Sequence, residues 1–187
     1  MLETVTLEHV PTSHSVHVAV FRNVTNAEFL QSQLLSRNAD FEYAFIDAST
    51  VISRFHLLSA VYKAITVELS GSMKTPNVHS EIISEAYRRY GIQPSTKDVV
   101  VVKVLISRDD APSTATSGDV AKHLETHVQG DPAPFSDDEL AKLTDWSKLR
   151  KYHKLNGVNY VEAIKDEQTK KRELELLVVS AMSLRGL

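Results

Sequence analysis

Two histidines in one stretch are the residues whose type and spacing come closest to metal chemistry. His123 and His127 are four residues apart, so one helical turn could direct both imidazoles toward a zinc ion. The metalloprotease motif places a glutamate directly after the first histidine, whereas Glu125 stands two residues after it, and no third ligand is evident. We therefore expect a solvated helix face here, without a metal ion or a cofactor.

A hydroxyl between an imidazole and a carboxylate is the second group that could do chemistry. Ser80 lies between His79 and Glu81, but adjacent residues on a helix point in different directions and cannot form a catalytic relay. Ser80 is instead expected to cap a helix. The sequence has no cysteine, which excludes thiolate catalysis and disulfides, and its six glycines form no phosphate-binding loop. These patterns predict a noncatalytic protein.

Two basic stretches could contact RNA. The net charge of −3 gives no overall attraction to nucleic acid, so any contact needs a local patch. The stretch Lys148–Lys154 holds four permanent cations around Tyr152, which could stack on a base while the cations neutralise phosphates. A second polar and basic patch, suited to single-stranded RNA, comprises Lys74, Asn77, His79, Arg88 and Arg89. A solvated helix is the open alternative for both stretches.

The carboxy-terminal segment is apolar on more than one side. A last helix is predicted over residues 160–184, and its later part carries a dense apolar cluster. One stripe of this cluster can pack on the sheet while another remains for a partner helix. Burial of the whole cluster inside the domain is the alternative. The two neighbouring sets are Leu177, Ala181 and Leu184 on one side, and Val178, Met182 and Arg185 rotated beside them.

Hydrophobic periodicity predicts the elements that must position these residues. Alternating apolar residues predict a hairpin of residues 4–10 and 15–22 and a short strand over 43–47. The continuously apolar, β-branched run 97–106 is expected in the middle of the sheet. The helix over 55–69 has apolar residues on several sides and should be largely buried. Further helices are predicted over residues 26–37, 82–90, 119–128, 137–146 and 147–155.

These elements together predict an α+β fold, with one domain over residues 1–187 and a small mixed or mainly antiparallel sheet packed with several α-helices. A length of 187 residues and a hydrophobic content of 42% are enough for a buried core. The small, polar stretch 107–118 should form a mobile loop. Because no secretory signal or membrane-spanning run is found, we expect a soluble protein in the nucleus and cytoplasm.

Eight segments carry a family resemblance when taken in their order along the chain. They are Asn23–Ala27, Phe45–Ala48, Phe55–Ile65, Met73–Thr75, Asn77–Ile83, Ser84–Ile92, Arg150–Leu155 and Ala181–Leu187. With them the chain resembles the small kinase-binding subunit of the KEOPS (EKC) complex, the PRPK-binding protein family, and above all its fungal members. The resemblance runs nearly end to end.

The resemblance implies a noncatalytic regulatory subunit that binds the amino-terminal lobe of the atypical kinase/ATPase of KEOPS and supports its activity. It also implies recruitment of tRNA through the single-stranded 3′ CCA end, for threonylcarbamoylation of the adenosine next to the anticodon. The complex is further linked to telomere maintenance and transcription, and its other subunits would be contacted indirectly. By position, the kinase surface would include Val178, Ala181, Met182 and Arg185. The tRNA surface would include Lys74, Asn77, His79, Arg88, Arg89, Arg150 and Lys151.

Two other functions and one departure from the family pattern remain open. The first alternative is a small single-stranded RNA-binding module that acts outside KEOPS. The second is a phosphohydrolase or nuclease that uses His123 or His127. Family members carry an extra stretch with Leu-Ser-Pro between the equivalents of Ile83 and Ser84, which this sequence lacks. The sequence therefore leaves open whether residues 77–90 form one helix or two elements.

Overall fold

Alternating valines build the centre of an antiparallel sheet in the computed structural model, which describes residues 1–86, 91–107 and 115–184. Its strands are β1 (Leu2–Val5), β2 (His14–Arg22), β3 (Ala44–Asp47), β4 (Val99–Ile106) and β5 (Asp131–Ala133). The strand order is β1-β2-β4-β3, and β5 pairs with the end of β2 beyond β1. The predicted hairpin and the central position of β4 are confirmed, although β1 ends at Val5 and does not reach residue 10.

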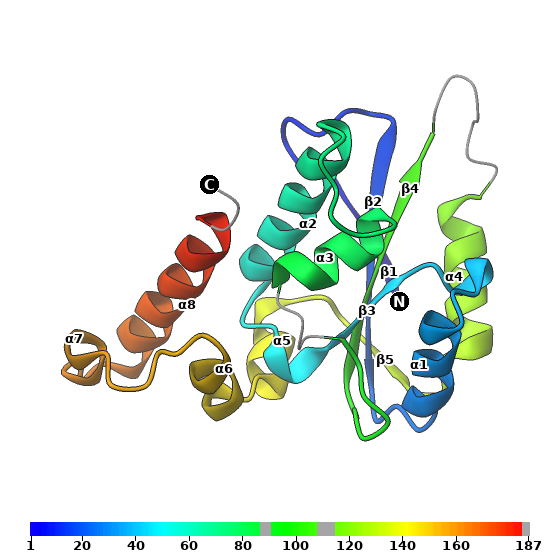
Figure 1. The fold of residues 1–187 in the computed structure, drawn as a ribbon. Coiled ribbons are helices and arrows are strands. Elements are labelled where there is room, and N and C mark those ends of the chain that lie inside the picture. Colours follow the sequence, from blue (N-terminus) through cyan, green and yellow to red (C-terminus); the bar gives the residue numbers. More distant parts are fainter. Residues whose placement is uncertain (87–90, 108–114, 185–187) are drawn as a thin grey trace.

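The two faces of the sheet are covered by different helices, as Figure 1 shows. Helices α2 (Arg54–Leu69) and α3 (Val78–Ala86) lie on one face, and α1 (Ala27–Leu35) and α4 (Ser117–His127) lie on the other. Because side chains alternate along a strand, Val16, Val18 and Val20 of β2 join the first core, while Ala19 and Phe21 join the second. The α+β fold predicted from the sequence is thereby confirmed.

The chain after β5 forms four shorter or peripheral helices. They are α5 (Asp137–Leu143), α6 (Trp146–Tyr152), α7 (Asn159–Glu162) and α8 (Glu167–Ser183). Earlier in the chain, two single-turn helices cover Ala39–Phe41 and Ala48–Thr50. The prediction of one helix over 160–184 is wrong, because the chain leaves the helix after α7. It starts again where the Asp166 side chain accepts a hydrogen bond from the Thr169 N–H.

Four sequence predictions fall wholly or partly on residues 87–90, 108–114 and 185–187, which lie outside the described residues. They are the helix over 82–90, the RNA contacts of Arg88 and Arg89, the mobile loop over 107–118 and the kinase contact of Arg185. The mobility of the stretch 107–118 therefore stays a prediction, but its end is corrected, because α4 already begins at Ser117. Helix α3 runs without a break across Ile83–Ser84 and ends its described part at Ala86. The prediction that Ser80 caps this helix is also corrected. Asn77 is the cap, because its Oδ1 accepts a hydrogen bond from the backbone N–H of Ser80.

None of the helices in these described ranges combines the length and the apolar character that crossing a membrane requires.

Among the glycines that the structure describes, Gly130 has the least space for an added methyl group. A Cβ there would lie 2.8 Å from the Arg22 carbonyl oxygen and 2.9 Å from Val24 Cγ2. Gly130→Ala is therefore expected to lower the free energy of unfolding by about 1–3 kcal/mol, measured by urea denaturation. Gly118→Ala is the control, because its Cβ would be 3.5 Å from the nearest atom, Thr116 Oγ1; it should leave stability unchanged or raise it. Equal stability of both variants would contradict this packing.

Candidate functional site

An apolar groove lies between α2, α8 and the segment after β1. Its volume is about 640 Å³. Phe55 and Tyr62 of α2 stand on its wall, and 57% and 41% of their surfaces are exposed. Val179 and Met182 of α8 lie buried beneath them and belong to the main core. We call this surface the apolar groove; the residues used below are Leu7, Phe55, Leu58, Tyr62, Val179 and Met182.

Helix α2 was predicted to be largely buried, and this prediction is wrong for one of its sides. Leu57, Val61 and Ile65 face the core with 0–2% exposure. Phe55, Tyr62 and Leu69 lie on another side and are exposed. Exposed large apolar side chains that gather beside a hollow mark an interaction surface more often than scattered single ones do. From the sequence, the residues on this side are predicted only to belong to a buried helix, and not to an interaction surface.

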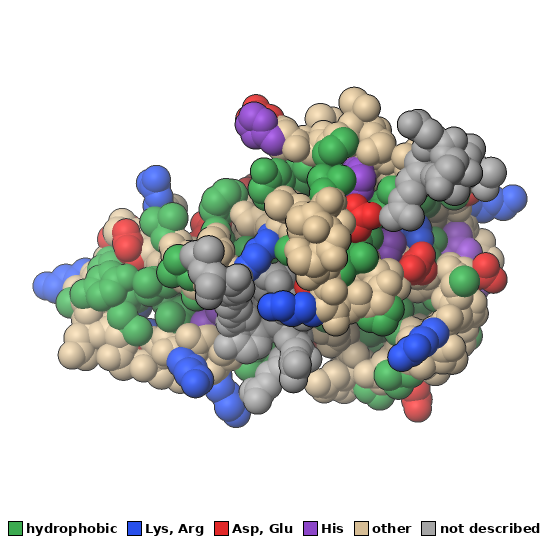
Figure 2. Space-filling view, turned by 45° about the horizontal axis from the view of Figure 1, so that its top comes forward, with side chains coloured by type: hydrophobic (Ala, Val, Ile, Leu, Met, Phe, Trp, Pro, Cys, Tyr) green, Lys and Arg blue, Asp and Glu red, His purple; other side chains and the backbone are tan. Residues whose placement is uncertain are grey.

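Helix α8 buries two of the four side chains that the family resemblance places on the kinase surface, Val178 and Met182. Val178 packs with Ile52 and Leu149 of α6, and Met182 packs in the main core. Ala181 is exposed, and Arg185 lies outside the described residues. In the neighbouring stripe Ala181 and Leu184 are exposed, Leu184 by 66%, whereas Leu177 is half-buried. Figure 2 shows hydrophobic side chains gathered over the part of the surface that α7 and α8 form.

Polar contacts fix α8 beside α2 and so fix the shape of the groove. Lys63 Nζ donates a hydrogen bond to the Met182 carbonyl oxygen at 2.8 Å. Ser53 Oγ, which also caps α2, donates to the Glu175 carboxylate. These bonds join the two ends of the groove wall across more than a hundred residues of sequence. Tertiary contacts between α2 and α8 therefore define the groove.

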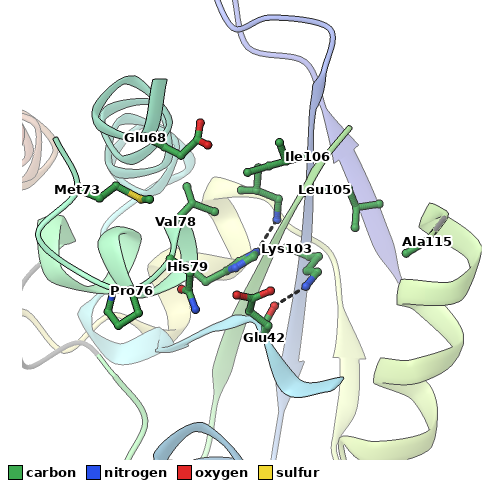
Figure 3. A pocket seen from close by; sticks show the side chains of 12 residues that line it. Glu42, Glu68, Met73, Pro76, Val78, His79, Lys103, Leu105, Ile106 and Ala115 are labelled. Atoms are coloured by element: carbon green, nitrogen blue, oxygen red, sulfur yellow. Dashed lines mark hydrogen bonds between the residues drawn. The ribbon is translucent and has the colours of Figure 1, made fainter. Parts of the chain in front are cut away.

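The first set of predicted RNA residues lies around the turn from α2 to α3. Lys74 is exposed, and Asn77 is half-buried with its side-chain oxygen used to cap α3. His79 is buried, and its Nε2 accepts a hydrogen bond from the Val104 N–H of β4 at 2.9 Å (Figure 3). Burial, with the nearby charge of Lys103, lowers the pKa of His79 to about 3. A neutral, inward-facing His79 joins α3 to the sheet, and its contact with RNA stays a prediction.

A cavity of about 500 Å³ opens between this turn and β4. Lys103 lies on its wall and donates from Nζ to the Glu42 carbonyl oxygen at 2.6 Å (Figure 3). Burial lowers the pKa of Lys103, and Glu42 partly offsets this. We call this hollow the Lys103 cavity. Lys103 was not singled out from the sequence, because it stands alone among valines in a strand.

The second set of predicted RNA residues lies elsewhere, on α6. Arg150 is bound to the Glu162 carboxylate of α7, and Lys148 donates to Asp47 Oδ2 at 2.5 Å. Lys151 is exposed. The ion pairs neutralise part of the basic run that the sequence displays as continuous. The structure therefore does not bring all the predicted RNA residues to one place, and Arg88 and Arg89 lie outside the described residues.

His123 and His127 do not form a solvated helix face, so that prediction is wrong. Both are half-buried, and their ring centroids are 4.3 Å apart. Phe41 packs in a T-shaped arrangement against both rings, and Tyr43 stacks on His123 with ring centroids 5.5 Å apart. No group of three side chains that could hold a metal ion occurs within residues 1–86, 91–107 and 115–184.

The family of the chain follows from a comparison with known proteins. The family model described as "Kinase binding protein CGI-121" matches residues 21–186. The chain belongs to the CGI-121 kinase-binding family. The match covers strands β3, β4 and β5, the helices α1 to α8 and the Lys103 cavity, whereas β1, most of β2 and Leu7 of the apolar groove precede it.

Curated fungal members of the CGI-121 family align with three quarters of the chain or more. The EKC/KEOPS complex subunit CGI121 of Gibberella zeae is 53% identical over 194 residues, which cover 99% of this chain and 98% of the relative. The subunit of the same name from Neurospora crassa is 49% identical and covers 100% and 99%. That of Schizosaccharomyces pombe is 35% identical over 150 residues, or 75% and 82%. The resemblance to fungal members of this family is thus confirmed.

Proposed function

We propose that this chain is a noncatalytic regulatory subunit of an EKC/KEOPS complex, which binds the atypical kinase/ATPase of that complex and supports its activity. Membership of the CGI-121 kinase-binding family supports this role. The apolar groove is the observation that carries it, because Phe55 and Tyr62 are held exposed beside a hollow of about 640 Å³. Aromatic anchors in the apolar centre of a patch supply most of the energy of protein–protein binding.

The proposed kinase surface extends from the groove onto the outer side of α8. Leu184 and Ala181 are exposed there and are continuous with the end of the groove at Ser183. Val178 and Met182, named from the family pattern, would act from below by holding α8 in place. The other subunits of the complex would be reached through the kinase.

A test of regulation without catalysis is an ATPase assay with purified components. The chain alone should hydrolyse no ATP above the buffer rate. Added to the kinase subunit of the complex from the same organism, it should raise ATP hydrolysis about fivefold or more, the scale of common coupling between binding and activity. An unchanged kinase rate in the presence of a proven complex would contradict the regulatory role, and hydrolysis by the chain alone would contradict the noncatalytic one.

We further propose that the chain helps to recruit tRNA through its 3′ CCA end, at the surface between Lys74 and the Lys103 cavity. An exposed cation beside a cavity that contains a second cation supports this location. A single-stranded end can enter a hollow that a duplex cannot, since its bases are free of pairing. Asn77 and His79 would position the cavity wall, and Arg150 and Lys151 would meet a different part of the tRNA.

Removal of the CCA nucleotides should reveal this contact. We expect tRNA that lacks CCA to bind about tenfold more weakly or worse, since stacked single-stranded bases contribute about 1–3 kcal/mol each. The affinity for intact tRNA should fall with salt, and Lys74→Glu should weaken binding further. Lys97→Glu, a change at an exposed lysine on another loop, is the matched control. Equal affinity for the two tRNAs would reject recruitment through the CCA end.

The cellular setting is part of the same proposal. A KEOPS subunit would work where the complex meets tRNA and chromatin, so we propose residence in both the nucleus and the cytoplasm, with telomere maintenance and transcription as further outputs of the complex. Cell fractionation of the tagged chain, followed by immunoblotting of each fraction, tests this placement. A chain confined to one compartment would contradict it.

A further inference from the structure

The histidine pair on α4 faces a cavity of its own. This hollow, which we call the histidine cavity, has a volume of about 380 Å³ and is lined by His123, His127, Phe41 and Tyr43, among others. It lies beside the Lys103 cavity, because Lys103 and Ala115 line both. The two hollows therefore adjoin at Lys103. Neither the kinase surface nor the predicted RNA residues account for the histidines.

A backbone hydrogen bond sets the tautomer of His127. Its Nδ1 lies 2.9 Å from the carbonyl oxygen of His123. A carbonyl oxygen can only accept, so Nδ1 carries the hydrogen and donates it. In the neutral ring, Nε2 is then left as an acceptor with a free lone pair. His127 thus presents an acceptor to its surroundings.

A side-chain hydrogen bond favours the opposite tautomer for His123. The Tyr43 hydroxyl lies 3.0 Å from His123 Nδ1. Tyr43 is buried, and burial raises its pKa to about 12, so the hydroxyl keeps its hydrogen. Donation of that hydrogen to Nδ1 gives the hydroxyl a partner, whereas the reverse bond would leave the hydrogen without one. His123 then carries its own hydrogen on Nε2 and presents a donor.

Both Nε2 atoms are available to a ligand. Neither has a hydrogen-bond partner among residues 1–86, 91–107 and 115–184, and neither belongs to the fully buried atoms of that part of the chain. The rings are also held in place. Phe41 packs against both in a T-shaped arrangement, Phe29 supports Phe41 at a centroid distance of 5.6 Å, and Tyr43 stacks on His123. A donor and an acceptor are therefore fixed side by side.

The chemistry of this pair selects among ligand classes. A phosphodiester offers acceptors only, so it would leave the neutral His127 Nε2 without a donor to bind. A zinc ion would need a third ligand, which the described residues do not supply. The edge of an unpaired nucleobase carries a donor next to an acceptor in one plane, and its face can rest against aromatic side chains. Lys103, at the junction of the two hollows, can neutralise a phosphate of the same strand.

We propose that His123 and His127 form a hydrogen-bonding edge that holds one unpaired nucleobase of an RNA end in the histidine cavity. The inference rests on the proposed recruitment of the tRNA 3′ end for the identity of the strand. In this proposal the histidines position the RNA through hydrogen bonds from their nitrogen atoms, and stacking of their rings alone would not be enough.

Substitution by phenylalanine separates the nitrogen atoms from the ring. His127→Phe and His123→Phe keep an aromatic ring against Phe41 while each removes one of the two hydrogen bonds to the base. Each should weaken binding of a short RNA that ends in CCA by about tenfold, in the range of one lost base contact. His9→Asn, at an exposed loop residue, should bind like the unchanged protein. If His127→Phe does not fold, His127→Leu replaces it, because leucine is apolar and offers the base no acceptor.

Nitrogen NMR of the histidine side chains gives a second readout that a purely structural role would not move. Titration with cytidine or adenosine monophosphate, at concentrations on the order of millimolar, should shift the ¹⁵N resonance of His127 Nε2, which gains a donor. His127 Nδ1, which stays on the His123 carbonyl, should shift little. Unchanged Nε2 resonances of both histidines at saturating RNA would overturn the inference.

The two proposals fail in different ways. If CCA removal weakens binding to the unchanged protein and to both phenylalanine variants equally, recruitment through the RNA end stands and the histidine edge is overturned. If CCA removal changes nothing but the mononucleotides shift His127 Nε2, the cavity binds a nucleobase and the proposed recruitment fails. Loss of the CCA effect in the variants alone supports both.

Discussion

Tyr62→Glu is expected to weaken binding of the kinase subunit by about 150- to 4000-fold, because it places a charge on the wall of the apolar groove. Truncation of an aromatic anchor in such a patch commonly costs about 2 kcal/mol or more, and an unpaired carboxylate adds a desolvation cost of about 1–3 kcal/mol. Tyr62 is 41% exposed, so the isolated chain should keep its fold. Titration calorimetry with the purified kinase measures the change, and circular dichroism checks the fold.

The matched control for this variant is Leu35→Glu. Leu35 is 77% exposed near the end of α1, on the other face of the sheet, so the same kind of charge should leave the affinity within twofold. Met182→Glu is unsuitable as a test, because Met182 is 3% exposed in the main core and a charge there would unfold the protein. Kinase binding that survives Tyr62→Glu would remove the groove from the interface.

Acid should destabilise this protein well above the pH at which carboxylates titrate. Burial lowers the pKa of His56, helped by the charge of His153, and that of His79, helped by Lys103, to about 3 each. In the unfolded chain both would titrate near 6.5, so the unfolded state binds more protons between pH 6.5 and 3. Stability is then fully present above pH 7 and falls as the pH drops through this window.

The size of the acid effect follows from the same pKa values. Between pH 8 and pH 5 each histidine should remove about 2 kcal/mol from the free energy of unfolding, and the two together about 4 kcal/mol. A typical domain has only about 5–15 kcal/mol in total. Urea denaturation at pH 8, 6.5 and 5 measures the loss. His79→Gln, which keeps an acceptor for the Val104 N–H, should reduce this loss of stability by about half, and His9→Asn should leave the loss unchanged. A stability that is flat from pH 8 to pH 5 would show that the two rings are not buried in neutral form.

The sheet could be predicted from the sequence because its signal is local. Val16, Val18 and Val20 alternate with the residues of the other face, and the unbroken valines of β4 indicated a strand covered on both sides. The break between α7 and α8 was missed, since no glycine or proline stands at 163–166. The signal that could have found it is Asp166 three residues before Thr169, an N-cap pattern inside an otherwise helical stretch.

The candidate sites were less predictable, because they depend on which face of each helix meets the core. Helix α2 is apolar at Phe55 and Tyr62 as well as at Leu57 and Val61, and only the position of the sheet decides which pair is buried. Likewise, His123 meets Tyr43 across 80 residues of sequence. No spacing rule along the chain can reveal such a contact.

Hydrogen–deuterium exchange of the chain, alone and saturated with the kinase subunit, tests the central claim most directly. The account predicts that peptides covering Phe55–Thr66 of α2 and Leu176–Leu184 of α8 gain protection, since these segments form the apolar groove and the outer side of α8. Peptides of α1 and α4 should exchange as in the free chain. Protection confined to α1 and α4, with α2 and α8 unchanged, would contradict binding of the kinase at the apolar groove.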